Sequence, residues 1–112
     1  MFNFFKKSSP KRKPTPIKRT EPAQVIRMPK MSDKMEFGVV SKWCVRLGDY
    51  INSGDVLVEV ETDKATMELE SYEDGKVLYL SVREGEKVDV NGVLVIIGNE
   101  GEDISHLLPT TD

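Results

Sequence analysis

A repeated pattern with a fixed period constrains the fold of this chain more than any other feature. Two stretches of the sequence align without a gap at an offset of 37 residues. The aligned segments are 38–40 with 75–77, 45–46 with 82–83, 48–49 with 85–86, and 56–58 with 93–95. Each copy has the pattern of a strand, a glycine-acid turn, a short strand, a second turn and a strand.

Neither copy of the repeat can cover its own apolar face, so the two copies are expected to pack against each other. The repeat therefore predicts an all-β fold, a flattened barrel or sandwich of two antiparallel sheets with an internal quasi-two-fold relation. The pattern does not fix which strands pair.

Between the two copies lies a predicted hairpin. Residues 56–61 and 65–70 each alternate apolar and polar side chains with period two, which is typical of half-buried strands. The short link places Lys64 at the tip, where an ammonium is accessible to another protein. A solvated lysine is the ordinary alternative to a modification site. Met35 and Met67 are predicted to pack in the core.

Charge divides the chain into two parts. Residues 1–20 carry seven basic residues and no acid, whereas the whole chain carries −3, so residues 21–112 carry −10. Residues 1–23 are basic and proline-rich, which predicts a disordered arm, and residues 1–22 are expected to be dispensable for folding. The arm could be a solvated linker, dock a partner or bind an anionic surface. No aromatic interleaving supports a specific nucleic-acid site.

Other classes of site lack the residues that they need. Cys44 and His106 are the only cysteine and histidine, so neither an intrachain disulfide nor a cysteine- or histidine-based metal site is expected. The sequence has no apolar run long enough for a membrane span. An all-β body of about eighty residues also leaves little room for a deep active-site cleft.

The predicted hairpin carries a motif of known type. Residues 61–65, Glu-Thr-Asp-Lys-Ala, resemble the lipoylation motif of lipoyl domains in 2-oxo acid dehydrogenase complexes. The resemblance extends to further segments: 27–40, Trp43, 47–49 and 54–57. The match predicts a lipoyl domain at residues 24–101, followed by a tail or the start of a linker at residues 102–112.

The resemblance implies a cofactor and a set of site residues. Lipoic acid is expected as an amide on Lys64, forming a swinging arm that moves acyl groups and electrons between active sites. The residues expected to contribute to recognition by partner enzymes are Glu61, Asp63, Ala65, Met31, Ser32 and Asp33. The implied partners are a lipoate ligase or octanoyl/lipoyl transferase, a thiamine-dependent 2-oxo acid decarboxylase, a dihydrolipoamide acyltransferase and dihydrolipoyl dehydrogenase.

Several functions remain as alternatives. Residues 65–68 resemble pyruvate dehydrogenase sequences more than oxoglutarate ones, so the closest relative is expected to be the pyruvate dehydrogenase acyltransferase component. A biotinyl carrier of the same fold has methionines on both sides of its lysine, whereas Asp63 and Ala65 flank Lys64. An unmodified interaction module is a further alternative. We expect a non-catalytic carrier, in the bacterial cytoplasm or alternatively the mitochondrial matrix.

Overall fold

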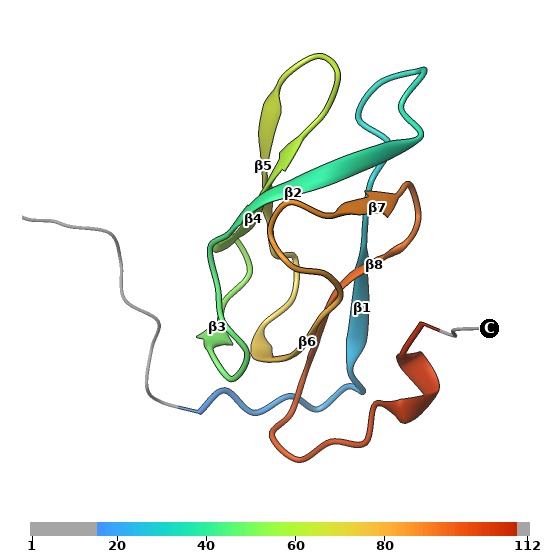
Figure 1. Cartoon of the computed structure of the whole chain (residues 1–112). Helices are drawn as coiled ribbons and strands as arrows, with labels where there is room; N and C mark the ends of the chain where they lie inside the picture. The colour runs from blue at the N-terminus through green and yellow to red at the C-terminus, as the bar shows by residue number, and fades with distance from the viewer. Residues whose placement is uncertain (1–15, 110–112) are drawn as a thin grey trace, which may run out of the picture.

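The computed structural model describes residues 16–109 of the chain, and these residues form two four-stranded antiparallel sheets (Figure 1). The strands are β1 (Gln24–Arg27), β2 (Phe37–Trp43), β3 (Tyr50–Ile51), β4 (Val56–Glu61), β5 (Thr66–Glu70), β6 (Gly75–Leu80), β7 (Lys87–Asp89) and β8 (Val93–Gly98), and a short 3-10 helix, η2 (Ser105–Leu107), follows. The predicted all-β class is confirmed.

The strand order reproduces the sequence repeat. One sheet has the order β1-β8-β6-β3 and the other β5-β4-β2-β7, so a shift of 37 residues carries β2, β3 and β4 onto β6, β7 and β8. Loop hydrogen bonds repeat as well. The Val40 N–H donates to the Glu86 carbonyl at 2.9 Å, and the Val77 N–H donates to the Asp49 carbonyl at 2.8 Å. The quasi-two-fold relation therefore extends to individual backbone contacts.

The acids of the glycine-acid turns have the same local role in both copies. The Asp49 carboxylate accepts the Arg46 N–H at 2.8 Å, and the Glu86 carboxylate accepts the Arg83 N–H at 2.8 Å. A carboxylate that binds the backbone in this way closes a turn without help from distant residues. The repeated glycine-acid pattern is thus explained by turn formation.

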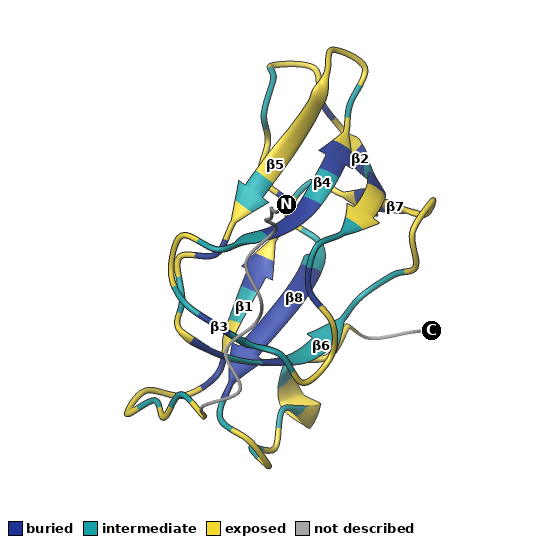
Figure 2. Cartoon of the chain, turned by 90° about the vertical axis from the view of Figure 1, so that its left-hand side faces the viewer, coloured by how far each residue is buried: buried dark blue, intermediate teal, exposed yellow. Residues whose placement is uncertain are grey.

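The core lies between the two sheets, where the buried strands of both face each other (Figure 2). Leu57, Val58 and Val60 of β4 are fully buried. A bulge between Val56 and Val58 in the pairing of β4 with β5 brings both Leu57 and Val58 inside. Each such side chain contributes roughly 1.5–3 kcal/mol when buried. The strict alternation of buried and exposed side chains expected for β4 is therefore broken in the N-terminal half of the strand.

The two methionines predicted to pack in the core have different environments. Met35 is buried, as expected, but Met67 is 43% exposed, so the prediction for Met67 is wrong. Met67 lies on β5, an edge strand near the end of a hairpin that extends beyond the opposite sheet (Figure 1). Apolar and polar residues alternate along β5, but four of its five residues are exposed because little of the protein covers this strand.

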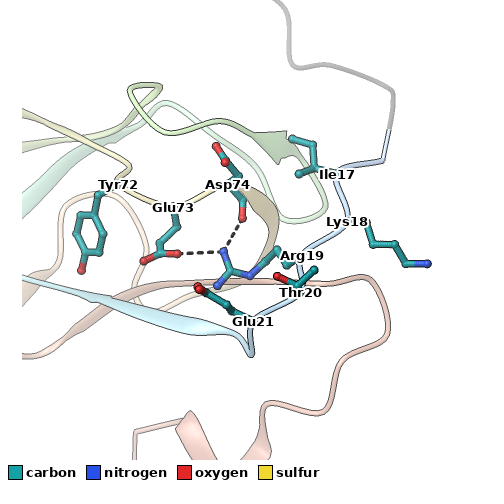
Figure 3. A pocket seen from close by; sticks show the side chains of 8 residues that line it. All are labelled: Ile17, Lys18, Arg19, Thr20, Glu21, Tyr72, Glu73 and Asp74. Carbon is teal, nitrogen blue, oxygen red and sulfur yellow. Dashed lines mark hydrogen bonds and ion pairs between the residues drawn. The ribbon is translucent and has the colours of Figure 1, made fainter.

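At the N-terminal edge, Arg19 fastens the chain to the body (Figure 3). Its side chain is 6% exposed and forms an ion pair with Glu73 at 3.0 Å. The guanidinium also donates to the carbonyls of Asp74 at 2.6 Å and Pro22 at 2.9 Å. The Arg19 N–H donates to the Asn99 side-chain oxygen at 2.7 Å. Arg19 therefore belongs to the folded body.

A second contact joins the N-terminal and C-terminal boundaries of the predicted domain. The Glu102 carboxylate accepts the N–H of Asn99 at 3.0 Å and the N–H of Ala23 at 2.8 Å. These two backbone donors, Asn99 first and Ala23 second, hold the pKa of the Glu102 carboxyl below its ordinary value. We propose that the folding unit runs from Arg19 to Glu102, which is wider than residues 24–101.

These contacts also change the expectation for the arm. Deleting residues 1–22 would remove Arg19 and its hydrogen bonds, so such a deletion is now expected to lower stability. Residues 1–15 and 110–112 lie outside the described part of the structure.

We predict that Arg19→Gln lowers the free energy of unfolding by about 1–3 kcal/mol, because the nearly buried guanidinium donates to the Glu73 carboxylate and to the carbonyls of Asp74 and Pro22. Lys18→Gln makes the same charge change at an exposed neighbour and should have almost no effect. Thermal unfolding followed by circular dichroism measures both. Equal midpoints for the two variants would contradict the role assigned to Arg19.

Candidate functional site

Lys64 lies in the turn that joins β4 to β5, at one end of the molecule (Figure 1). The Thr62 N–H donates to the Ala65 carbonyl at 2.9 Å, which closes the turn. The Thr62 hydroxyl oxygen accepts the N–H of Lys64 at 3.1 Å and of Ala65 at 3.2 Å, and the hydroxyl donates to the Ala65 carbonyl at 3.0 Å. One threonine thus satisfies the polar backbone of the turn.

The Lys64 side chain is exposed. Within residues 16–109 the ion pairs join Arg19 to Glu73 and Lys76 to Glu100, and Lys64 is in neither. The turn is held by the threonine and the backbone, so acylation of the Lys64 amine would break no contact of the described residues. A primary amine on a stiff and accessible tip fits covalent attachment of lipoic acid.

The loop before β2 lies beside this turn. Met35 is buried and anchors the loop, because its N–H donates to the Ser32 carbonyl at 3.2 Å and its sulfur accepts the Met31 N–H at 3.2 Å. The Lys30 ammonium donates to the Met35 carbonyl at 3.1 Å. Asp33 is exposed at the loop's outer side. Contacts within the loop thus hold it in the observed conformation.

A cleft of about 190 Å³ joins the loop to the lysine turn, and it is lined by Lys34, Met35, Glu36, Phe37 and Asp63. Phe37 was not singled out by the sequence, yet it is 44% exposed, and the Lys87 ammonium lies 4.9 Å from its ring centroid. Its position before the buried Gly38 in an alternating strand is the signal that places it on the outer face.

The residues predicted to contribute to recognition do not all lie on the surface. Glu61, Asp63 and Ala65 are exposed around Lys64, and Asp33 is exposed on the neighbouring loop. Met31 and Ser32 are half-buried, and Met31 packs against the core. The structure thus brings the hairpin and loop together, but it gives Met31 a packing role as well.

Two other kinds of site were sought in the described residues. Residues 16–109 contain no group of three or more histidines, cysteines or acids that could hold a metal ion. In the same residues no helix has both the length and the apolar character needed to cross a membrane.

A rigid hairpin that presents one free lysine on two related sheets is the architecture of a prosthetic-group carrier. Comparison with known proteins agrees. The model of the family described as "Biotin-requiring enzyme", which covers biotin and lipoyl attachment, matches residues 24–97. The chain belongs to this biotin/lipoyl attachment family.

Curated proteins that are similar to this chain include components of pyruvate dehydrogenase complexes. The chain is 47% identical to the dihydrolipoyllysine-residue acetyltransferase component of the pyruvate dehydrogenase complex of Rhizobium meliloti, over 71% of this chain and 18% of that protein. It is 41% identical to the mitochondrial pyruvate dehydrogenase complex protein X component of Chaetomium thermophilum, over 76% of this chain and 20% of that protein.

A solved structure gives the same result. The lipoyl domain of the 2-oxoglutarate dehydrogenase complex from Azotobacter vinelandii superposes with a TM-score of 0.58 at 26% identity, covering 69% of this chain and 98% of that domain. The chain is a lipoyl carrier domain, and its expected likeness to the pyruvate dehydrogenase acyltransferase component is confirmed. It spans about a fifth of the length of the curated relatives it matches.

We predict that Thr62→Ala loosens the lysine turn by about 1 kcal/mol, because three hydrogen bonds lose their hydroxyl. Amide hydrogen exchange should accelerate at Lys64 and Ala65. Thr62→Ser keeps the hydroxyl and should restore protection. Thr66→Ala is the matched control on β5, since its hydroxyl makes no hydrogen bond within residues 16–109. Unchanged exchange in Thr62→Ala would contradict this account of the turn.

Proposed function

We propose that Lys64 is the lipoylated residue of this carrier domain and that the domain serves a pyruvate dehydrogenase complex. The observation that carries the proposal is the exposed Lys64 amine on a turn that Thr62 and the backbone hold closed. The match of the chain to pyruvate dehydrogenase acetyltransferases supports the choice of complex.

The bound lipoyl group would supply a disulfide that accepts an acyl group and two electrons. The chain itself holds the root of the arm. The lysine stem and the attached chain extend on the order of 10–15 Å from the turn, at about 1.2 Å of advance per bond. Because Thr62 fixes the turn, the position of the root is set by β4 and β5, and the freedom of the arm lies beyond the Lys64 Cα.

Charge around Lys64 supports recognition by cationic enzyme surfaces. The register of β4 and β5 places Glu59 opposite Glu68, and Glu61 and Asp63 add exposed acids toward the tip. Complementary charge favours correct encounter and rejects wrong partners. The proposed partners are a lipoate ligase or octanoyl/lipoyl transferase, a thiamine-dependent decarboxylase, a dihydrolipoamide acyltransferase and dihydrolipoyl dehydrogenase.

In this role the domain is not itself a catalyst, although it serves or belongs to an acyltransferase. Relatives from a bacterium and from mitochondria support the bacterial cytoplasm or the mitochondrial matrix as its location. The biotinyl alternative is not favoured, since curated relatives are dihydrolipoyllysine-residue acetyltransferases and a solved lipoyl domain matches the chain.

We predict that lipoate ligase, ATP and lipoate modify Lys64 and no other lysine. Peptide mass mapping of the product identifies the site. Lys64→Arg should keep the fold and abolish the modification, because a guanidinium offers no comparable nucleophile. Labelling of Lys34 or Lys76 in its place, or a biotin adduct formed by biotin ligase, would refute the assignment.

We also predict that the lipoylated domain is reductively acylated fastest by the pyruvate decarboxylase component, compared with the oxoglutarate and branched-chain enzymes. Glu61→Gln and Asp33→Asn should each lower kcat/KM about two- to fivefold, because each removes one exposed charge from the recognition surface.

Glu21→Gln provides the control for these variants, since it removes one exposed acid beside Arg19, at the other end of the molecule (Figures 1 and 3). It should leave kcat/KM unchanged. Equal rates for the three decarboxylases would reject the choice of complex and leave the carrier role intact. An equal loss in Glu21→Gln would reject local recognition by Glu61 and Asp33.

A further inference from the structure

Phe37 is an exposed aromatic side chain that the carrier function leaves unexplained. It lies at the start of β2, is 44% exposed and is not part of the core between the sheets. A single exposed apolar side chain is ordinary on a protein surface. Phe37 differs because its ring lines the cleft between the loop before β2 and the lysine turn, two segments that lie at the same end of the molecule (Figure 1).

Contacts on both sides of Phe37 fix the position of its ring. Phe37 pairs with Asp89 of β7, and the Val90 N–H donates to the Glu36 carbonyl at 2.9 Å. The Lys87 ammonium lies 4.9 Å from the ring centroid, in the range of a cation–π contact. The ring is therefore presented to the cleft by paired strands rather than by a free loop.

The cleft begins where the lipoyl arm would be attached. Asp63, which immediately precedes Lys64, lines the same cleft of about 190 Å³ as Phe37. An arm that extends on the order of 10–15 Å from the turn can fold back into a cleft of this size. A tethered group is held near the cleft at an effective concentration on the order of millimolar, so even a weak contact is populated.

The lining of the cleft suits a small neutral group. Phe37 supplies an exposed ring, and the buried Met35 supplies apolar atoms. The other lining residues, Lys34, Glu36 and Asp63, are exposed and carry one positive and two negative charges, which disfavours an anionic occupant. A dithiolane is neutral, mostly apolar and rich in polarisable sulfur, and sulfur makes favourable contacts with aromatic rings.

We propose that this cleft is a docking site for the dithiolane ring of the domain's own lipoyl arm, with Phe37 as the residue that it contacts. The inference rests on the lipoylation of Lys64 proposed above. Docking holds the disulfide against the domain when no enzyme is bound, and an enzyme that uses the arm must draw it out of the cleft. Lys64 thus fixes the root of the arm, and Phe37 gives its far end a resting position.

The first test is nuclear Overhauser spectroscopy of the full chain, lipoylated enzymatically and checked by mass mapping at Lys64. The ring protons of Phe37 should give cross-peaks to the dithiolane protons. The amide signals of residues 34–37 should also differ between the lipoylated and unlipoylated forms. If the cross-peaks are absent and these signals do not change, the docking proposal is overturned.

The second test measures how fast a water-soluble phosphine reduces the lipoyl disulfide, because a docked ring is shielded from a reagent in solution. Phe37→Ser should raise the rate on the order of twofold, as expected for a ring that is docked about half of the time in the parent. The variant leaves the charge unchanged. Thermal unfolding checks that it remains folded, and the cross-peaks of the parent chain test the proposal independently of any variant.

Tyr72→Ser is the matched control. Tyr72 is 62% exposed, but it lines the pocket beside Arg19 and not the cleft at the lysine turn (Figure 3). Its reduction rate should equal that of the parent. Equal rates for Phe37→Ser and the parent, or an equal increase in Tyr72→Ser, would reject docking on Phe37. A lipoylated Lys64 without docking rejects this inference alone, whereas a chain that is not lipoylated at Lys64 rejects the proposed function as well.

Discussion

Mutual burial of the two repeat copies is the interaction on which the rest of this structure depends. Val40 and Val77 are counterparts in the repeat, as are Val58 and Val95, and all four are essentially inaccessible to water. Both copies supply residues to the one apolar layer, so neither has an independent core. A small body of this kind gains stability by closing one layer between two sheets, which leaves the ends of the sandwich free for other roles.

The symmetric scaffold has two ends with different chemistry. At one end, the Thr62 hydroxyl closes the turn internally and leaves the side chain of Lys64 without a partner among residues 16–109. At the other end lies Asn99, which stands 37 residues after Thr62 and is its counterpart in the repeat. Its side-chain oxygen accepts the Arg19 N–H, and its side-chain nitrogen donates to the Arg19 carbonyl. One end of the sandwich therefore presents a free amine, and the other end fastens the chain to the body.

The sequence predicted what depends on local pattern and failed where distant residues decide. The repeat and the turn chemistry gave the sheets and the hairpin, and Asn91 even takes the positive φ of its counterpart Gly54. Met67 was misassigned because alternation does not reveal whether an opposite sheet covers an edge strand. The Arg19 anchor was missed because Asn99, its partner, lies 80 residues away, and no local signal links them.

The lysine hairpin carries an electrostatic cost that its own strands do not offset. Glu59 and Glu68 face each other across β4 and β5, and like charges in directly opposed positions destabilise a strand pair. Val58 and Val60, on the same strand, are fully buried and hold β4 against the core. The core thus keeps the hairpin formed while the acids remain beside Lys64, where the proposed enzymes approach. One face of β4 supplies stability, and the opposite face carries acids of the proposed recognition surface.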